Sequence, residues 1–481
     1  MLKGFTRNFR PLEVLTEEQV DAIWRGILEV LEHTGLEFET EKALKIFDKG
    51  GCKVDYDNRR VRFPPGLVTE CLRKCPSSFR LEARDPENDI VIGGDAVYVH
   101  PGPGMRYVDI DTFEPREATK KEFYDAVTVY DALPNLHILH GNSPNFSFEG
   151  VPPIMATIES YAARARNSTK VNGMSCSFGN HVFNIEIAKV VGAKGLWGAG
   201  ASAPLAWNDD AISGTISAIE AGIPVGWSSG GMWGASAPAT IAGQIITTSA
   251  EVMGPLVLTQ LIDPGHPVDT KLFTFPQNMR TGAPFFDNIT IGLSNAAFHQ
   301  VWRRYSIPTF SIEASIPSSK CMDFQSGYEK GMIALASAIS GSHVVWIHGT
   351  IHGEVTAHPV QAIMDDDIAG MIGRFLEGVT VNDETLAIDL IKEVGPIPGF
   401  YLNKEHTRKW WQKEQFIPAV ADILTLPEWI KEGKKTTIDL AKEKMEEILA
   451  THKVSIPLTA SQEEDIERIL AEARKFYKEK I

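Results

Sequence analysis

Residues 196–227, LWGAGASAPLAWNDDAISGTISAIEAGIPVGW, contain the pattern that decides the fold. A short apolar run, Leu196–Ala201, comes first, and the apolar residues of Ala211–Ala221 then follow helical spacing. A second short apolar run, Pro224–Trp227, ends the segment. Strand, helix and strand in this order form the repeating unit of a parallel α/β sheet. The segment therefore predicts one repeat of an α/β domain.

The same alternation continues from about residue 134 onward, with helical stretches such as Ile154–Arg166 and Tyr328–Ser340 between short apolar runs. The candidate strands are Leu136–His140, Lys170–Asn172, Leu196–Ala201, Pro224–Trp227, Leu256–Gln260, Ile307–Ile312, His343–His348 and Val379–Asn382. Eight such repeats predict an α/β fold of the TIM (β/α)8 barrel type. The alternative is a doubly wound open sheet. That fold needs a glycine-rich phosphate turn after a strand, and Gly198-Ala199-Gly200 is too short a match.

Two regions flank the predicted barrel. Residues 16–34 begin with capping-box spacing at Thr16 and Gln19 and predict an amphipathic helix that ends at Gly35. The tail is rich in Lys, Glu and Trp and ends in a second amphipathic pattern. We expect an N-terminal α+β region over 1–118, the barrel as catalytic domain over 119–400 and a C-terminal helical extension over 401–481.

Composition excludes several classes of protein. The 481 residues carry 47 Lys and Arg against 62 Asp and Glu, a net charge of −15, which argues against binding to nucleic acid or to anionic lipid. Residues 221–250 are uncharged, but glycine and proline interrupt them, so we expect barrel wall and no membrane span. Five scattered cysteines and an N-terminus without a signal-peptide pattern predict a cytoplasmic protein.

Aromatic and polar side chains gather where the predicted strands end, which is where TIM barrels carry their active sites. These positions are Asn142, Asn172, Trp207, Trp227, Glu313, Trp346 and His348. A quaternary ammonium ion has no N–H to donate and is recognised best by ring faces. The set therefore predicts a pocket for an organic cation. The alternative is that each tryptophan only seals the barrel.

A metal site is a separate possibility at His348 and His352. Helical i, i+4 geometry is not available to this pair, because Gly349 and Gly353 interrupt the strand-to-loop transition. Metal binding, structural hydrogen bonding and contact with substrate all stay open for these histidines. We expect no metal.

Several stretches in series resemble segments of the trimethylamine:corrinoid methyltransferase superfamily. They are DIDTFEPREAT at 109–119, GASAPATIAGQ at 234–244, AEVM at 250–253, QLIDPGHP at 260–267, DFQSGYE at 323–329, MDDDIA at 364–369 and DETLAID at 383–389. The resemblance implies a TIM barrel and a methylated amine as methyl donor. It also implies that Co(I) of a corrinoid, cob(I)alamin or its relatives, accepts the methyl group on a separate partner protein, with no cofactor bound tightly here.

One position departs from the family pattern. The trimethylamine enzymes are expected to carry pyrrolysine after the seventh strand, and an ungapped match to residues 349–356 places Gly353 there, beside His352. The chain thus resembles the non-pyrrolysine branch, which implies quaternary amines such as glycine betaine, with proline betaine and carnitine as relatives. Such a donor leaves as a neutral tertiary amine, so its methyl transfer needs no general acid or metal.

The strand-end residues and the resemblance together predict a methyltransferase that converts glycine betaine to dimethylglycine. We expect the ammonium group at Trp207, Trp227, Phe310 and Trp346, the carboxylate at His348 and Arg280, and the pocket wall at Asn142, Asn172 and Glu313. One alternative is a zinc-dependent methyltransferase of the methanol or thiol type, with metal at His348, His352 or Cys176. Another is a non-catalytic betaine-binding protein. We also expect a homo-oligomer.

Overall fold

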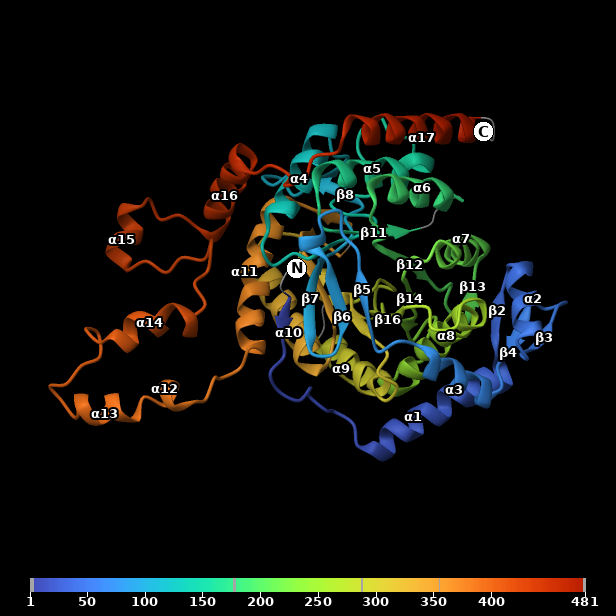
Figure 1. Cartoon of the computed structure of the whole chain (residues 1–481), viewed down its shortest axis with the longest axis horizontal. Helices are drawn as coiled ribbons and strands as arrows, with labels where there is room; N and C mark the ends of the chain where they lie inside the picture. The colour runs from blue at the N-terminus through green and yellow to red at the C-terminus, as the bar shows by residue number, and fades with distance from the viewer. Residues whose placement is uncertain (1–3, 176–178, 287–288, 354, 479–481) are drawn as a thin grey trace.

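Eight parallel strands close into a barrel within the residues that the computed structural model describes, 4–175, 179–286, 289–353 and 355–478 (Figure 1). In chain order they are β7 (Ala96–Pro101), β10 (Ile138–Leu139), β11 (Val171–Ser175), β12 (Leu196–Gly200), β14 (Val225–Ser229), β16 (Val268–Leu272), β18 (Thr309–Ser311) and β19 (Val344–His348). The ring closes between β7 and β10, where the His137 N–H donates to the Val99 carbonyl at 2.9 Å and the Val99 N–H donates to His137 Nδ1 at 3.0 Å.

A helix follows each of these strands in the described ranges. The helices are α4 (Lys120–Ala132), α5 (Ala156–Asn167), α6 (His181–Val191), α7 (Asp209–Glu220), α8 (Ile241–Ile262), α9 (Ile289–Arg303), α10 (Phe324–Ser340) and α11 (Pro359–Leu376). Together they surround the strands (Figure 1). The alternation of strand and helix confirms the predicted TIM barrel, and it confirms the helices predicted at Ile154–Arg166, Ala211–Ala221 and Tyr328–Ser340.

Two of the predicted strands are wrong. Leu256–Gln260 lies inside helix α8, and Val379–Asn382 is an exposed irregular segment that follows α11. Strands β16 and β7 take their places in the barrel. The α8 run is buried on nearly every side, so it lacks the polar face that distinguishes a helix from a buried strand in sequence. Helix α8 is also long and apolar enough to span a membrane, but 78% of its most apolar window is buried in the protein, as in a core helix.

The N-terminal region packs against α8. Helix α1 (Glu17–Glu29) begins at the predicted capping box, where Thr16 Oγ1 accepts the Gln19 N–H at 3.3 Å, and it continues through the π-turn η1 (Val30–Thr34) to Gly35. A small sheet of β2 (Leu36–Phe38), β3 (Lys53–Asp55), β4 (Arg60–Arg62) and β13 (Ala206–Trp207) follows, with α2 (Glu41–Lys49) and α3 (Pro65–Lys74) beside it. The prediction of the first helix is confirmed.

The C-terminal part covers other barrel helices. Helix α16 (Thr437–Thr451) packs on α4 and α11, and α17 (Ala460–Lys478) packs on α5 and α6. Between α11 and α16 the chain leaves the barrel through the short helices α12 (Asp383–Leu386), α13 (Ile388–Val394), α14 (Glu405–Glu414) and α15 (Leu426–Lys431), on the left in Figure 1. The division into 1–118, 119–400 and 401–481 stays a prediction. Strand β7 lies in the first of these regions and is nevertheless a strand of the barrel.

Shorter elements line the two ends of the barrel. They are β1 (Phe5–Thr6), β5 (Ser78–Leu81), β6 (Ile90–Gly93), β8 (Arg106–Val108), β9 (Pro115–Arg116), β15 (Met232–Trp233), β17 (Phe275–Pro276), β20 (Thr350–Ile351), β21 (Thr356–Ala357), η2 (Pro86–Asn88), η3 (Pro153–Met155) and η4 (Glu313–Ser315). Those that follow the carboxyl ends of barrel strands, such as the β20–β21 hairpin after β19, lie on the face that carries the candidate site.

Candidate active site

A cavity of about 190 Å³ opens at the carboxyl end of the barrel lumen, and three aromatic rings form one of its walls. Trp346 of β19 stacks on His100 of β7 with 4.3 Å between ring centroids and 11° between planes. His140, just after β10, lies 4.6 Å from the Trp346 ring at a tilt of 59°. These rings offer π-faces of the kind that attract a cationic centre.

The opposite wall is made of residues with small side chains. Gly198 and Gly200 of β12, Gly173 of β11 and Ser228 of β14 all line the cavity. Strand β12 stands four strands away from β19 in the ring of eight, so it faces Trp346 across the lumen. The atom nearest to a Cβ atom placed on Gly198 would be the carbonyl oxygen of Met174, 3.8 Å away. The absence of side chains there leaves the lumen open.

A buried ion pair on β16 lies at the base of the cavity. Lys271 lines the cavity, and its Nζ lies 2.5 Å from Asp269 Oδ1, with side chains 6% and 0% exposed. The same Nζ lies 4.7 Å from the Phe310 ring centroid. Burial raises the pKa of Asp269 to about 6, although the charge of Lys271 opposes that rise. The lumen therefore holds a lysine side chain whose carboxylate partner, Asp269, is itself costly to ionise.

The two histidines in the wall are neutral at physiological pH. Burial lowers the pKa of His140 to about 3 and holds the pKa of His100 well below its ordinary value. His100 Nδ1 lies 2.7 Å from the Pro101 carbonyl oxygen, which places the ring proton on Nδ1. Neutral imidazoles add ring surface to the cavity without adding positive charge.

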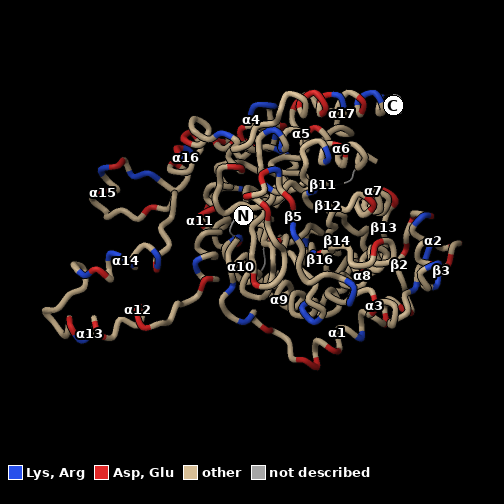
Figure 2. The backbone as a smooth tube through the Cα atoms, in the orientation of Figure 1, with Lys and Arg blue, Asp and Glu red and all other residues tan. Residues whose placement is uncertain are grey.

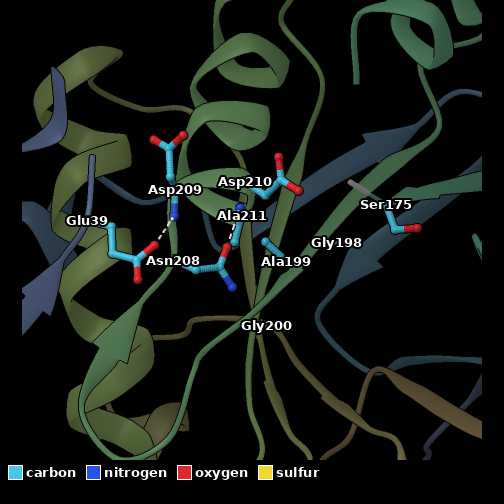
Figure 3. A pocket seen from close by; sticks show the side chains of 9 residues that line it. All are labelled: Glu39, Ser175, Gly198, Ala199, Gly200, Asn208, Asp209, Asp210 and Ala211. Atoms are coloured by element: carbon cyan, nitrogen blue, oxygen red, sulfur yellow. Dashed lines mark hydrogen bonds between the residues drawn. The ribbon is translucent and has the colours of Figure 1, made fainter. Parts of the chain in front are cut away.

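An acidic groove of about 550 Å³ adjoins the cavity and shares Ser175, Gly198, Ala199 and Gly200 with it. Figure 3 shows Glu39, Asp209 and Asp210 along this groove. Glu39 Oε2 accepts the Asp209 N–H at 3.0 Å, and Asn208 Oδ1 accepts the Ala211 N–H at 2.9 Å, so the groove also caps helix α7. Carboxylates at an entrance raise the local concentration of cations.

Two of the residues predicted from sequence line the cavity, namely Trp346 and Asn142. Asn142 Oδ1 accepts a hydrogen bond from Ser175 Oγ at 3.3 Å at the rim. A third, Phe310, lies next to the cavity, with its ring against Lys271. The structure brings these three together, and their contact with a substrate stays a prediction.

Trp207 and Trp227 lie in the core outside the lumen. Their rings meet edge to face at 5.1 Å, and both side chains are fully buried. Trp207 Nε1 donates to the Glu251 carbonyl at 2.9 Å, and Trp227 Nε1 donates to Thr259 Oγ1 at 3.2 Å. Both partners belong to α8, so these tryptophans join that helix to the barrel wall.

The remaining predicted residues also lie away from the cavity. His348 points to α11, where its Nε2 lies 3.1 Å from Asp366 Oδ1, because the strand register shifts between Trp346 and His348. Asn172 accepts from Arg164 Nε at 2.8 Å. Glu313 is fully buried and accepts from Asn295 and two backbone N–H groups, and burial raises its pKa to about 7.

Arg280 and the pyrrolysine-equivalent position lie on loops. Arg280 is exposed on the turn after β17. His352 and Gly353 form the tip of the β20–β21 hairpin, and the Gly353 N–H donates to the Pro317 carbonyl at 2.6 Å. Gly353 has a φ of +66°, and a Cβ atom there would lie 2.9 Å from the Phe286 ring. The backbone thus favours glycine at this position.

Metal coordination was the other chemistry considered for the histidines. Across residues 4–175, 179–286, 289–353 and 355–478, no three His, Cys, Asp or Glu side chains gather as ligands. Cys176, which the zinc alternative would use, lies outside the described residues. The absence of a metal stays a prediction.

Sequence reasoning missed Lys271, Asp269, His100 and His140. The first two belong to VDTKL at 268–272, where two charged residues alternate with apolar or neutral ones. All five positions are buried, so the charged residues face the lumen and the residues between them face the helices. Charged residues at every second position of a short buried strand were the pattern that could have identified Asp269 and Lys271.

Comparison with known proteins agrees with this architecture. The family described as trimethylamine methyltransferase (MTTB) matches residues 1–145 and 179–475. A trimethylamine methyltransferase of Desulfitobacterium hafniense (strain DSM 10664 / DCB-2) is 29% identical over 449 residues, which cover 91% of this chain and 89% of the relative. A glycine betaine methyltransferase of Desulfitobacterium hafniense (strain Y51) is 30% identical over 450 residues, covering 91% and 92%. The solved Methanosarcina barkeri monomethylamine methyltransferase has a TM-score of 0.51 at 13% identity, covering 89% of this chain and 92% of its own, a likeness of fold alone.

Proposed function

The chain belongs to the trimethylamine methyltransferase family, and on this premise we propose that it demethylates a quaternary amine that carries a carboxylate, with glycine betaine as the substrate. Dimethylglycine would be the product, and Co(I) of a corrinoid on a partner protein would accept the methyl group. The observation that carries this proposal is a buried lysine, Lys271, in a cavity walled by Trp346 and two neutral histidines.

The charges in the cavity favour a zwitterion over a simple cation. A protonated methylamine would place its positive charge near Lys271, and among the described residues Asp269 is the one carboxylate paired with that lysine. A betaine instead brings one carboxylate for Lys271 Nζ and one ammonium group for the ring wall. Each buried charge then has a partner, which removes most of the penalty for burying it.

The residues in the cavity suit a reaction that needs positioning more than acid–base chemistry. The C–N bond breaks with its electron pair staying on nitrogen, so a neutral tertiary amine leaves and no proton has to be supplied. The side chains have to hold one N-methyl group toward the barrel mouth and to exclude water. A wall of rings on one side, with glycines opposite, binds the cation without enclosing it, and so does not oppose the loss of charge in the transition state.

The mouth of the barrel suits a transient protein partner. Large apolar side chains follow the carboxyl ends of β7, β11, β16, β18 and β19 and are 36–86% exposed: Met105, Val182, Met279, Phe285, Phe324 and Val355. Scattered apolar groups of this kind fit a modest interface that forms and releases in each turnover. We place the corrinoid protein over this rim, above the cavity.

The proposed cellular location is the cytoplasm. The described cysteines Cys52, Cys71, Cys75 and Cys321 are all free thiols, as in proteins of reducing compartments. Burial raises the pKa of Cys52 to about 12 and that of Cys71 to about 11, so neither thiol is activated as a nucleophile.

The experiment is a methyl-transfer assay with cob(I)alamin, following methylcobalamin and the demethylated amine together. We expect dimethylglycine from glycine betaine and no turnover of trimethylamine. Turnover of trimethylamine but not of any betaine would contradict the role given to Lys271. Turnover of proline betaine or carnitine alone would support a zwitterionic substrate but would show that this substrate is not glycine betaine.

A further inference from the structure

Residues 379–435, which we call the arm, leave the barrel after α11 and return at α16 (Figure 1). The arm contains the helices α12 to α15, and none of these four helices has a single buried residue. Basic and acidic residues alternate along it (Figure 2), so it is not a single-charge tail. An ordered segment of this length without a core of its own needs another surface to pack on.

The arm exposes an unusual amount of apolar surface. Six of its large apolar side chains are 67–95% exposed: Val379, Val381, Ile397, Leu402, Ile423 and Leu426. With the half-exposed apolar residues between them, the arm presents on the order of 1,000 Å² of apolar surface. That total is comparable to the ~800 Å² that each partner buries in a stable interface.

The arm is nevertheless held in a defined shape. Asp367 of α11 accepts the N–H groups of Ala419, Val420 and Ala421 at 2.7, 2.9 and 3.1 Å. Arg374 Nη2 lies 2.9 Å from Glu414 Oε2 at the same junction. The base of the arm is therefore fixed on α11, where Val420 is buried, while the apolar side chains of the helices α12 to α15 stay uncovered.

Helices as short as these do not persist alone in water. Isolated helices below about 12–15 residues are marginal even with favourable sequences. Helix α14 has 10 residues, α13 has 7, α15 has 6 and α12 has 4. The arm thus needs a permanent cover, which a corrinoid protein that leaves after each methyl transfer cannot supply.

A second uncovered apolar surface lies on the barrel helices. The outer faces of α9, α10 and α11 expose apolar residues at i, i+4 spacing: Ile289 and Leu293, Tyr328 and Met332, and Met371 and Phe375. We call these six residues the outer patch. Helix α10 packs between α9 and α11, so the six residues lie on three neighbouring helices. Other barrel helices are covered instead, α8 by α1 to α3 and α5 and α6 by α17.

We propose that the arm of one copy of this chain packs on the outer patch of a second copy. The two surfaces are both apolar and both exposed in a single chain, and the arm has apolar surface of the size that a stable interface requires. Reciprocal exchange between two copies covers both arms and both patches in the smallest closed assembly. The inference stands apart from the proposed substrate, because it uses no residue of the cavity.

Two single substitutions and their mixture test this contact by sedimentation. Leu402→Glu places a charge on the arm, and Met332→Glu places one on the outer patch, at side chains that are 84% and 53% exposed in one chain. We expect the parent protein to sediment as a multiple of 53.0 kDa at micromolar concentration and each variant as a single chain. An equal mixture of the two should regain a dimer, because the intact arm of one variant meets the intact patch of the other. Val91→Glu, 39% exposed on β6, is the matched control and should sediment like the parent.

Three results would overturn the proposal. The first is a parent protein that stays a single chain at these concentrations. The second is an oligomer that Leu402→Glu leaves intact. The third is a mixture that does not reassociate, because an arm-to-patch contact would leave one intact contact in the mixed pair. Hydrogen exchange is a second measurement that does not depend on solubility. The amides in α13 and α14 should be protected from exchange in the parent and should exchange freely in Leu402→Glu.

Discussion

Replacement of Lys271 by methionine is the change that separates a betaine site from a simple cation site. Methionine keeps the length and the apolar stem of the side chain and removes its charge. Lys271 is 6% exposed, so its contact with a substrate carboxylate would be screened little by water. A hydrogen bond to a charged group contributes ~1.5–3 kcal/mol, so loss of the contact should lower kcat/KM for glycine betaine by roughly 10- to 150-fold.

The assay compares two ligands that differ in the carboxylate. Isothermal calorimetry measures glycine betaine and tetramethylammonium on the parent, on Lys271→Met and on Lys271→Met/Asp269→Asn. The double variant removes the carboxylate that Lys271→Met would leave unpaired, and it controls for disruption of the buried pair. We expect both variants to lose glycine betaine affinity. Tetramethylammonium should bind Lys271→Met at least as well as the parent, because a repulsive charge has gone, and should bind the double variant about as well as the parent, because both charges have gone.

Equal losses for the two ligands would show that the substitution damages the cavity in general. Unchanged affinity for glycine betaine would refute the reasoning directly, since it would mean that the substrate carboxylate lies elsewhere. Urea unfolding of the double variant, with both partners removed, verifies that the barrel itself remains intact.

Three further predictions concern the same cavity. Trp346→Leu should weaken glycine betaine binding by about 3- to 30-fold in calorimetry, because one cation–π contact contributes ~0.5–2 kcal/mol. Binding as tight as in the parent would show that the ring wall does not hold the ammonium group. Gly198→Val should abolish turnover in the cob(I)alamin assay, because the extra methyl groups enter the cavity. The thermal midpoint should change little, since a Cβ atom at this position meets nothing closer than 3.8 Å. Gly198→Ala is the mild control, and full activity of the valine variant would contradict the assignment of the lumen as the substrate site. Burial raises the pKa of Asp269 to about 6, and protonation of Asp269 leaves the charge of Lys271 without its carboxylate partner. Glycine betaine should therefore bind more tightly as the pH falls from 7.5 to 5.5 (~2 pH units around that pKa). If the affinity of Asp269→Asn depends on pH in the same way, the effect belongs to another group.

The barrel was predictable because its repeat is long and regular. Segments such as Leu196–Trp227 pair a short buried strand with an amphipathic helix, and that alternation is visible without any tertiary information. The error at Leu256–Gln260 has a physical cause, since a helix buried on all sides has the same local composition as a buried strand. Strand β7 was missed because irregular connections and the short β8 and β9 separate it from its helix α4, so no strand–helix repeat is apparent there.

The site was harder to predict because it depends on which way each side chain faces. Trp346 and His348 lie two residues apart on one strand and would share a face in a regular ladder. The register shift between them sends Trp346 into the lumen and His348 toward Asp366. Lys271 and Asp269 escaped notice since their strand had not been recognised, and only the closed ring brings β16 and β19 to one cavity.

A structure of the protein with glycine betaine bound tests the central claim most directly. The account predicts a ligand in the lumen with its carboxylate within hydrogen-bonding distance of Lys271 Nζ and its methyl groups against the Trp346 and His100 rings, with one methyl toward the mouth. A ligand bound outside the barrel, or one inside it with its ammonium group toward Lys271, would contradict the account.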